Sequence, residues 1–75
     1  MPRTQEEKKF LFNKLAVRRV NVLLHQMKLI ANLSNRANYE YTDDQYKKIF
    51  VALRSRLDKC EKEFAFKQRE PFTLD

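Results

Sequence analysis

Apolar residues recur every three or four positions along two long segments, which is the spacing of an α-helix. The first segment runs from about residue 5 to 33 and the second from about residue 43 to 66. Each opens with a Thr-x-x-Glu or Thr-x-x-Gln capping box, at residues 4–7 and 42–45, with acidic side chains in the first turn. Neither segment contains glycine or proline. The pattern predicts an all-α fold of two long helices joined by a loop over residues 34–42.

The second predicted helix has one apolar stripe, and charged side chains cover its other faces. The stripe consists of Tyr46, Ile49, Phe50, Leu53, Leu57, Cys60 and Phe64. Because Cys60 lies within the stripe, we expect a small buried thiol there. The charged faces are typical of a solvated helix surface.

The first predicted helix is apolar on two sides when its residues are placed at about 100° intervals. One side, the broad apolar face, consists of Ala16, Val20, Leu23, Leu24, Met27, Ile30 and Ala31. The other side, called here the leucine face, consists of Leu11, Leu15, Val22, Leu29 and Leu33. Arg19 and Gln26 separate the two faces. A long antiparallel two-helix hairpin would cover only the broad face. The leucine face therefore predicts either self-association into a four-helix bundle or docking on a different protein.

Between these faces runs a narrow polar edge, called here the basic strip. Its members follow one another at spacings of four, three, four, three and four, and none is a carboxylate: Lys14, Arg18, Asn21, His25, Lys28 and Asn32. Such an edge is compatible with plain solvation. It is also typical of a row of cations that meets phosphates or an acidic protein surface.

Charge is distributed unevenly along the 75 residues, whose net charge is +6. Residues 1–38 carry eight basic and two acidic side chains, whereas residues 39–75 carry eight of each. No acid occurs between Lys8 and Tyr39. The asymmetry favours an anionic partner for the first half, although solubility alone would also explain a basic protein. The candidate phosphate-binding residues are Lys14, Arg18, Arg19, Lys28 and Arg36.

The predicted loop is unusual because the chain contains no glycine to form it. Asn35 is the expected cap of the first helix, since asparagine tolerates left-handed backbone geometry. Tyr39 or Tyr41 can pack over the end of the helices. Alternatively, Arg36 and one of these tyrosines form a site that stacks an unpaired base. The sequence leaves both interpretations of the loop open.

The composition gives little indication of an active site, a metal site or a membrane-spanning segment. There is one histidine, His25, and one cysteine, Cys60, which is short of a usual zinc set. We expect no enzyme activity, no cofactor, no metal site and no membrane span. The single cysteine and the charged start of the chain favour a cytoplasmic setting without a secretory signal. Residues 67–75 are expected to form an extended polar tail after the helical region 1–66.

A resemblance covers residues 18–64 and is carried by three stretches, Arg18-Arg19-Val20-Asn21, Asn32-Leu33-Ser34-Asn35-Arg36 and Tyr39-Glu40-Tyr41-Thr42. They resemble a segment of small uncharacterised helical-hairpin proteins of bacteria and their mobile elements. The resemblance implies a helical hairpin and a phage or plasmid setting. That family carries no established activity, so it assigns no site residue.

Two function hypotheses follow from the sequence. The first is a small, basic, non-enzymatic protein that associates with DNA or RNA, as a subunit of a nucleoprotein complex. The second is an adaptor or inhibitor that presents the leucine face to another protein. A subunit of a nucleoprotein complex would use both surfaces.

Overall fold

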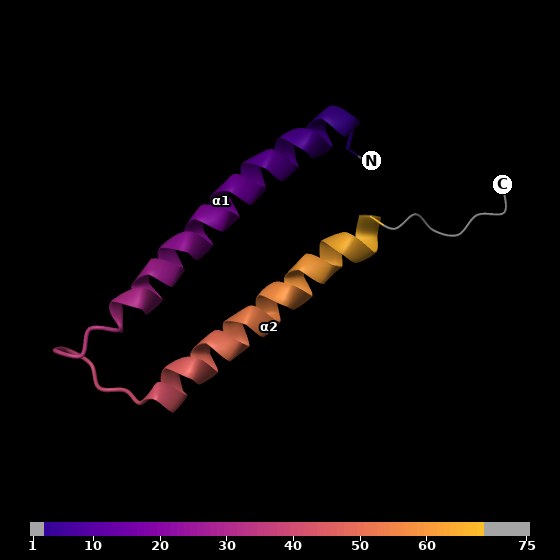
Figure 1. Ribbon diagram of the computed structural model, residues 1–75. Coiled ribbons are helices and arrows are strands. Elements are labelled where there is room, and N and C mark those ends of the chain that lie inside the picture. Colours follow the sequence, from indigo (N-terminus) through magenta and orange to yellow (C-terminus); the bar gives the residue numbers. More distant parts are fainter. Residues whose placement is uncertain (1–2, 69–75) are drawn as a thin grey trace. The chain divides into compact units, whose positions relative to one another are not determined.

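The computed structural model describes residues 3–68, and these residues form two α-helices and no strand. Helix α1 spans Gln5–Asn32 and helix α2 spans Asp43–Gln68 (Figure 1). The predicted all-α class and the order of the helices are confirmed. The chain divides into two units, Met1–Glu40 with α1 and Tyr41–Asp75 with α2. The antiparallel packing of α1 on α2 and the four-helix bundle stay predictions.

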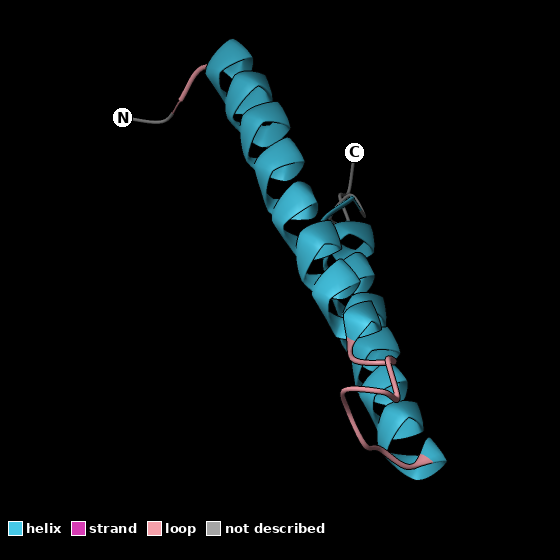
Figure 2. Cartoon of the chain, turned by 90° about the vertical axis from the view of Figure 1, so that its left-hand side faces the viewer, coloured by secondary structure: helices cyan, strands magenta, loops and turns pink. Residues whose placement is uncertain are grey.

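Helix α1 begins at the threonine that the sequence indicates. Thr4 is the N-cap, with φ −68° and ψ 164°, and its side-chain oxygen accepts a hydrogen bond of 3.1 Å from the Glu7 backbone N–H. The Lys8 N–H donates the first helical bond to the Thr4 carbonyl at 2.9 Å. Glu6 and Glu7 place negative charge at the positive end of the helix dipole. With no glycine or proline to interrupt it, α1 continues unbroken for 28 residues (Figure 2).

The end of α1 is closed by short backbone bonds. Leu33 is the C-cap with φ −68° and ψ −11°. Its N–H donates to the Ile30 carbonyl at 3.0 Å, and the Ser34 N–H donates to the Ala31 carbonyl at 3.0 Å. These three-residue spacings tighten the last turn and satisfy carbonyls that an α-helix leaves unpaired.

The prediction that Asn35 caps α1 in a left-handed conformation is wrong. No described residue has a positive φ angle. A left-handed cap is unnecessary here because the right-handed Leu33 already continues the tightened turn. Asn35 instead organises the loop that follows.

Helix α2 begins with the complete capping box that the sequence predicts. The Thr42 N–H donates to Gln45 Oε1 at 2.8 Å, and the Gln45 N–H donates back to Thr42 Oγ1 at 3.1 Å. Two backbone donors at the helix start are thereby satisfied by one pair of side chains. Asp43 and Asp44 add the favourable acidic first turn.

Helix α2 extends through Gln68, the last described residue, two residues beyond the predicted end at residue 66. Lys67, expected in the extended tail, is helical and brings a cation to the negative end of the helix dipole. The rest of the predicted tail, residues 69–75, lies outside the described residues.

Neither unit buries any of its described side chains. The partly covered ones are Leu11, Leu15, Ala16, Ile30, Tyr41 and Leu53. Cys60 is exposed, which corrects the expectation of a buried thiol, because a single helix stripe has nothing of its own to cover it. Most helix stability in proteins comes from packing an amphipathic face. The apolar faces of both helices are therefore exposed in the units as described.

Replacement of Thr42 by alanine tests the capping box. Thr42→Ala removes the side-chain acceptor at the start of α2 and should lower the free energy of unfolding by about 0.5–2 kcal/mol. Thermal unfolding followed by far-ultraviolet circular dichroism measures the change. Ser55→Ala, in the middle of the same helix, is the control and should leave stability unchanged or slightly higher, because alanine is the better helix former. Equal stability of Thr42→Ala and the native chain would contradict the role of the cap.

Candidate nucleic-acid and partner-binding surfaces

The basic strip forms one exposed side of α1. All six of its side chains are exposed, and from Lys14 to Asn32 the strip extends about 27 Å along the helix. Since no acid lies between Lys8 and Tyr39, no carboxylate of α1 lies within one helical turn of its residues. The strip offers ammonium, guanidinium, amide and imidazole groups, all of which can donate hydrogen bonds to phosphate oxygens.

An aromatic residue that the sequence analysis left out extends the strip at its N-terminal end. The Lys14 ammonium lies over the Phe10 ring, 5.9 Å from its centroid, and the Phe10 side chain is 64% exposed. This cation–π contact favours one position of the Lys14 side chain on the strip. Spacing of four between Phe10 and Lys14 is the signal that places the two on the same side of a helix.

Two of the five predicted phosphate-binding residues do not lie on the strip. Arg19 follows Arg18 directly, so it is turned by about 100° around the helix and lies across the leucine face. Arg36 lies in the connection after the end of α1. Helix α1 thus brings together Lys14, Arg18 and Lys28 and separates the other two from them.

The leucine face lies on α1 between the basic strip and Arg19. Val22 is 57% exposed, and Leu29 and Leu33 are each 45% exposed, whereas Leu11 and Leu15 are partly covered. These five apolar residues share one side over about six helical turns, which is more than the scattered exposed apolar residues normal for a protein surface.

Asn35 explains how the loop closes without glycine. Its side-chain Oδ1 accepts a hydrogen bond of 3.0 Å from the Ala37 N–H, which forms an Asx turn. Its backbone carbonyl accepts from the Asn38 N–H at 3.1 Å and from the Tyr39 N–H at 2.9 Å. Three backbone donors therefore converge on one asparagine in a right-handed turn.

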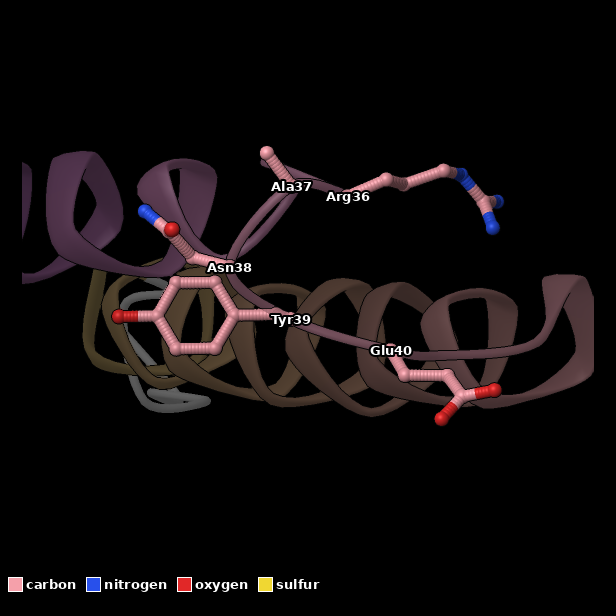
Figure 3. Close-up of a pocket in the computed structure, with 5 residues that line it drawn as sticks. All are labelled: Arg36, Ala37, Asn38, Tyr39 and Glu40. Carbon is pink, nitrogen blue, oxygen red and sulfur yellow. The ribbon is translucent and has the colours of Figure 1, made fainter.

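Residues 36–40 line an open hollow of about 360 Å³ within the connection (Figure 3). Tyr39 is 48% exposed. The close-up shows the Tyr39 ring on the same side as Asn38, whereas the Arg36 side chain extends in the opposite direction. The structure therefore does not join Arg36 and Tyr39 in one stacking site.

Tyr41, the other predicted stacking residue, contacts a neighbouring ring. It is partly covered, and its ring lies edge-on to Tyr46 with centroids 6.3 Å apart and an interplanar angle of 86°. This is a favourable geometry for an aromatic pair. The contact supports the structural interpretation of Tyr41, as a residue that holds the start of α2.

The rest of the described surface adds no further chemical site. On α2, Lys62 and Asp58 form an ion pair of 3.0 Å between exposed side chains, which contributes little to stability. Within residues 3–68 no three histidine, cysteine or acidic side chains are grouped so that they could hold a metal ion. Neither of the two helices, as far as they are described, is long and apolar enough to cross a bilayer.

Comparison of the chain with protein-family models, curated protein sequences and solved structures found no match. The function of these surfaces therefore has to be argued from their own geometry and charge.

Replacement of Asn35 tests how the loop is organised. Asn35→Ala removes the side-chain acceptor of the Ala37 N–H and should cost about 0.5–1.5 kcal/mol locally. Amide hydrogen exchange should show the Ala37 N–H exchanging faster, with the centre of α1 unchanged. Asn35→Asp keeps the acceptor and should retain slow exchange. Identical Ala37 exchange in the alanine variant and the native chain would rule out the Asx turn.

Proposed function

We propose that the protein binds nucleic acid, without enzymatic activity, through the basic strip of α1. The observation that carries the proposal is the alignment of Lys14, Arg18 and Lys28 along one exposed side of a continuous helix that has no acid beyond its first turn. A cationic row of this kind gains affinity from the release of counterions condensed on phosphates. A cytoplasmic setting is part of the proposal.

The spacing of the three cations suits a polyanion better than a single phosphate. Lys14 and Arg18 are about 6 Å apart along the helix axis, and Lys28 lies about 15 Å beyond Arg18. No single phosphate can contact all three. Asn21 and His25 lie between Arg18 and Lys28 and offer donors to the same backbone.

Phe10 gives the strip a means of distinguishing single strands from duplexes. Its exposed ring adjoins Lys14 at the end of the strip. Stacking on an aromatic ring requires an unpaired base, whereas phosphate contacts are available on any nucleic acid. The combination favours single-stranded or looped segments.

The leucine face supports protein binding as a second function on the same helix. It carries exposed Val22 and Leu29, and Arg19 and Gln26 separate it from the broad apolar face. A protein with both surfaces fits the role of a subunit in a nucleoprotein complex.

Removal of the three cations tests the phosphate surface. Lys14→Gln, Arg18→Gln and Lys28→Gln together should weaken binding to labelled duplex DNA, single-stranded DNA and structured RNA by at least about tenfold at low salt, with a smaller salt slope. For the native strip on duplex DNA, three phosphate contacts correspond to a log–log slope of about −2.7. Fluorescence anisotropy across a range of salt measures both quantities.

The matched control removes the same charges from α2. Lys47→Gln, Arg56→Gln and Lys59→Gln together lower the net charge equally, although these residues do not share a side of the helix. This variant should retain most of the affinity. Equal loss in the two triple variants would mean that net charge, and not the strip, determines binding.

Substitution of Phe10 tests the preference for unpaired bases. Phe10→Ala should weaken binding to single-stranded DNA by about 5- to 160-fold, the range expected for loss of one base–aromatic stack, and should leave duplex binding nearly unchanged. The same anisotropy titrations measure it. Phe66→Ala on α2, where the ring is 70% exposed, is the control. A parallel loss on duplex and single strand would exclude stacking by Phe10.

A further inference from the structure

The leucine face is symmetric about Val22. Leu15 and Leu29 each lie seven residues from Val22, and Leu11 and Leu33 each lie eleven residues from it. We infer that α1 pairs with α1 of a second copy of this chain, antiparallel, with a two-fold axis at Val22. A two-fold interface uses the same surface on both copies, so its contacts must be complementary under reversal of the helix direction.

In such a pair, every residue of the leucine face meets an apolar residue of the second copy. In an antiparallel pair centred on Val22, this residue meets its own copy, Leu15 meets Leu29 of the second copy, and Leu11 meets Leu33. The side chains concerned are exposed or only partly covered in the single chain. No apolar residue of the face is left opposite a charge.

Charge next to the seam favours antiparallel over parallel pairing. A parallel pair would bring Arg18 of each copy onto the same rim as Arg19 of the other, at nearly the same level along the helix, and no acid lies within one turn of them. In the antiparallel pair, Arg18 of one copy is level with His25 of the second copy, to within about one residue along the helix. Arg19 is level with Gln26 of the second copy to the same precision. The two copies of Arg18 are then about 12 Å apart along the axis, beyond the Debye length of about 8 Å at physiological salt.

A second copy fits the face better than other occupants do. The symmetry about Val22 lets apolar residues meet apolar residues when the helix pairs with its own reversed copy, whereas docking on an unrelated helix gives no reason for it. A lipid surface would have to immerse Arg19 and Gln26, which lie between the leucine face and the broad apolar face. In a pair of helices the same two residues lie at the rim.

The antiparallel pair also brings both basic strips to one side of the dimer. The strip is turned by about 80° from the leucine face, so it lies at the side of the pair. A two-fold axis perpendicular to the plane of the two helices places the strip of the second copy on that same side. Two sets of Lys14, Arg18 and Lys28 then face the same direction. This consequence deepens the proposed nucleic-acid function and rests on it, whereas the dimer itself does not.

Sedimentation equilibrium of the full chain, without nucleic acid, tests the dimer. The native protein should have twice the monomer mass of 9.1 kDa. Val22→Glu places two carboxylates against each other in an apolar seam and should weaken the dimer by at least about a hundredfold. Val17→Glu is the matched control, because Val17 is on the same helix, is 62% exposed and lies off the leucine face. A native monomer, or equal loss in the two variants, would overturn the inference.

Disulfide formation tests the orientation in a background of Cys60→Ser. Oxidation of Val22→Cys alone should give a cross-linked dimer, because each copy meets itself at the axis. Leu15→Cys alone should not cross-link, but a mixture of the Leu15→Cys and Leu29→Cys chains should give the mixed dimer. Cross-linking of Leu15→Cys with itself would indicate a parallel pair, and absence of the mixed dimer would also overturn the antiparallel one. Circular dichroism of each cysteine variant checks that its helicity is retained.

The salt dependence of binding separates the dimer from the nucleic-acid proposal. If both strips of a dimer engage duplex DNA, the log–log slope should be about −5.4, twice that of one strip. A dimer by sedimentation that binds no nucleic acid would refute the proposed function and leave the dimer intact. A monomer that binds with the slope of one strip would refute the dimer and leave the function intact.

Discussion

The lack of carboxylates on α1 beyond its first turn governs how this helix can be used. The acids Glu6 and Glu7 serve the start of the helix, and no other acid follows before Glu40. Lys14, Arg18 and Lys28 have no counter-charge one turn away on the same helix, where such pairs commonly form. They are therefore available to an anionic partner. The same shortage makes a parallel pair of α1 helices unfavourable, because it would bring like charges into register.

The local chemistry that starts each helix could be predicted from the sequence with good accuracy. Thr4 and Thr42 form side-chain bonds within three residues of themselves, so the relevant atoms are close in sequence and need no tertiary structure. The C-terminal ends of the two helices are harder to predict from the sequence. Helix α1 ends through backbone hydrogen bonds at Leu33, which depend on no particular side chain and so leave no signal in the sequence. Helix α2 continues to Gln68 because Pro71 restricts only the residue directly before it.

The candidate site shows the same division between what spacing can and cannot predict. The basic strip and the leucine face follow from angles around a helix, and they hold once α1 is continuous. Charge alone makes Arg19 and Arg36 candidates, and their positions set them apart from Lys14 and Arg18. Phe10 is uncharged and belongs to neither apolar face, so the spacing of charged and apolar residues does not single it out. The Arg36–Tyr39 pairing depended on loop geometry, and the turn around Asn35 directs the two side chains apart.

In the proposed assembly, each of the three sides of α1 has its own partner. The sequence predicts that the broad apolar face packs on the stripe of α2. The leucine face is symmetric about Val22 and so suits a copy of itself. The basic strip lies beside the leucine face, about 80° around the helix, and would remain exposed at the side of the proposed pair. In that pair, Gln26 and His25 would lie level with Arg19 and Arg18 of the second copy, so the rim would carry hydrogen-bonding groups in place of further cations. On this proposal, a single helix of 28 residues supports assembly and anion binding without any side chain being required for both.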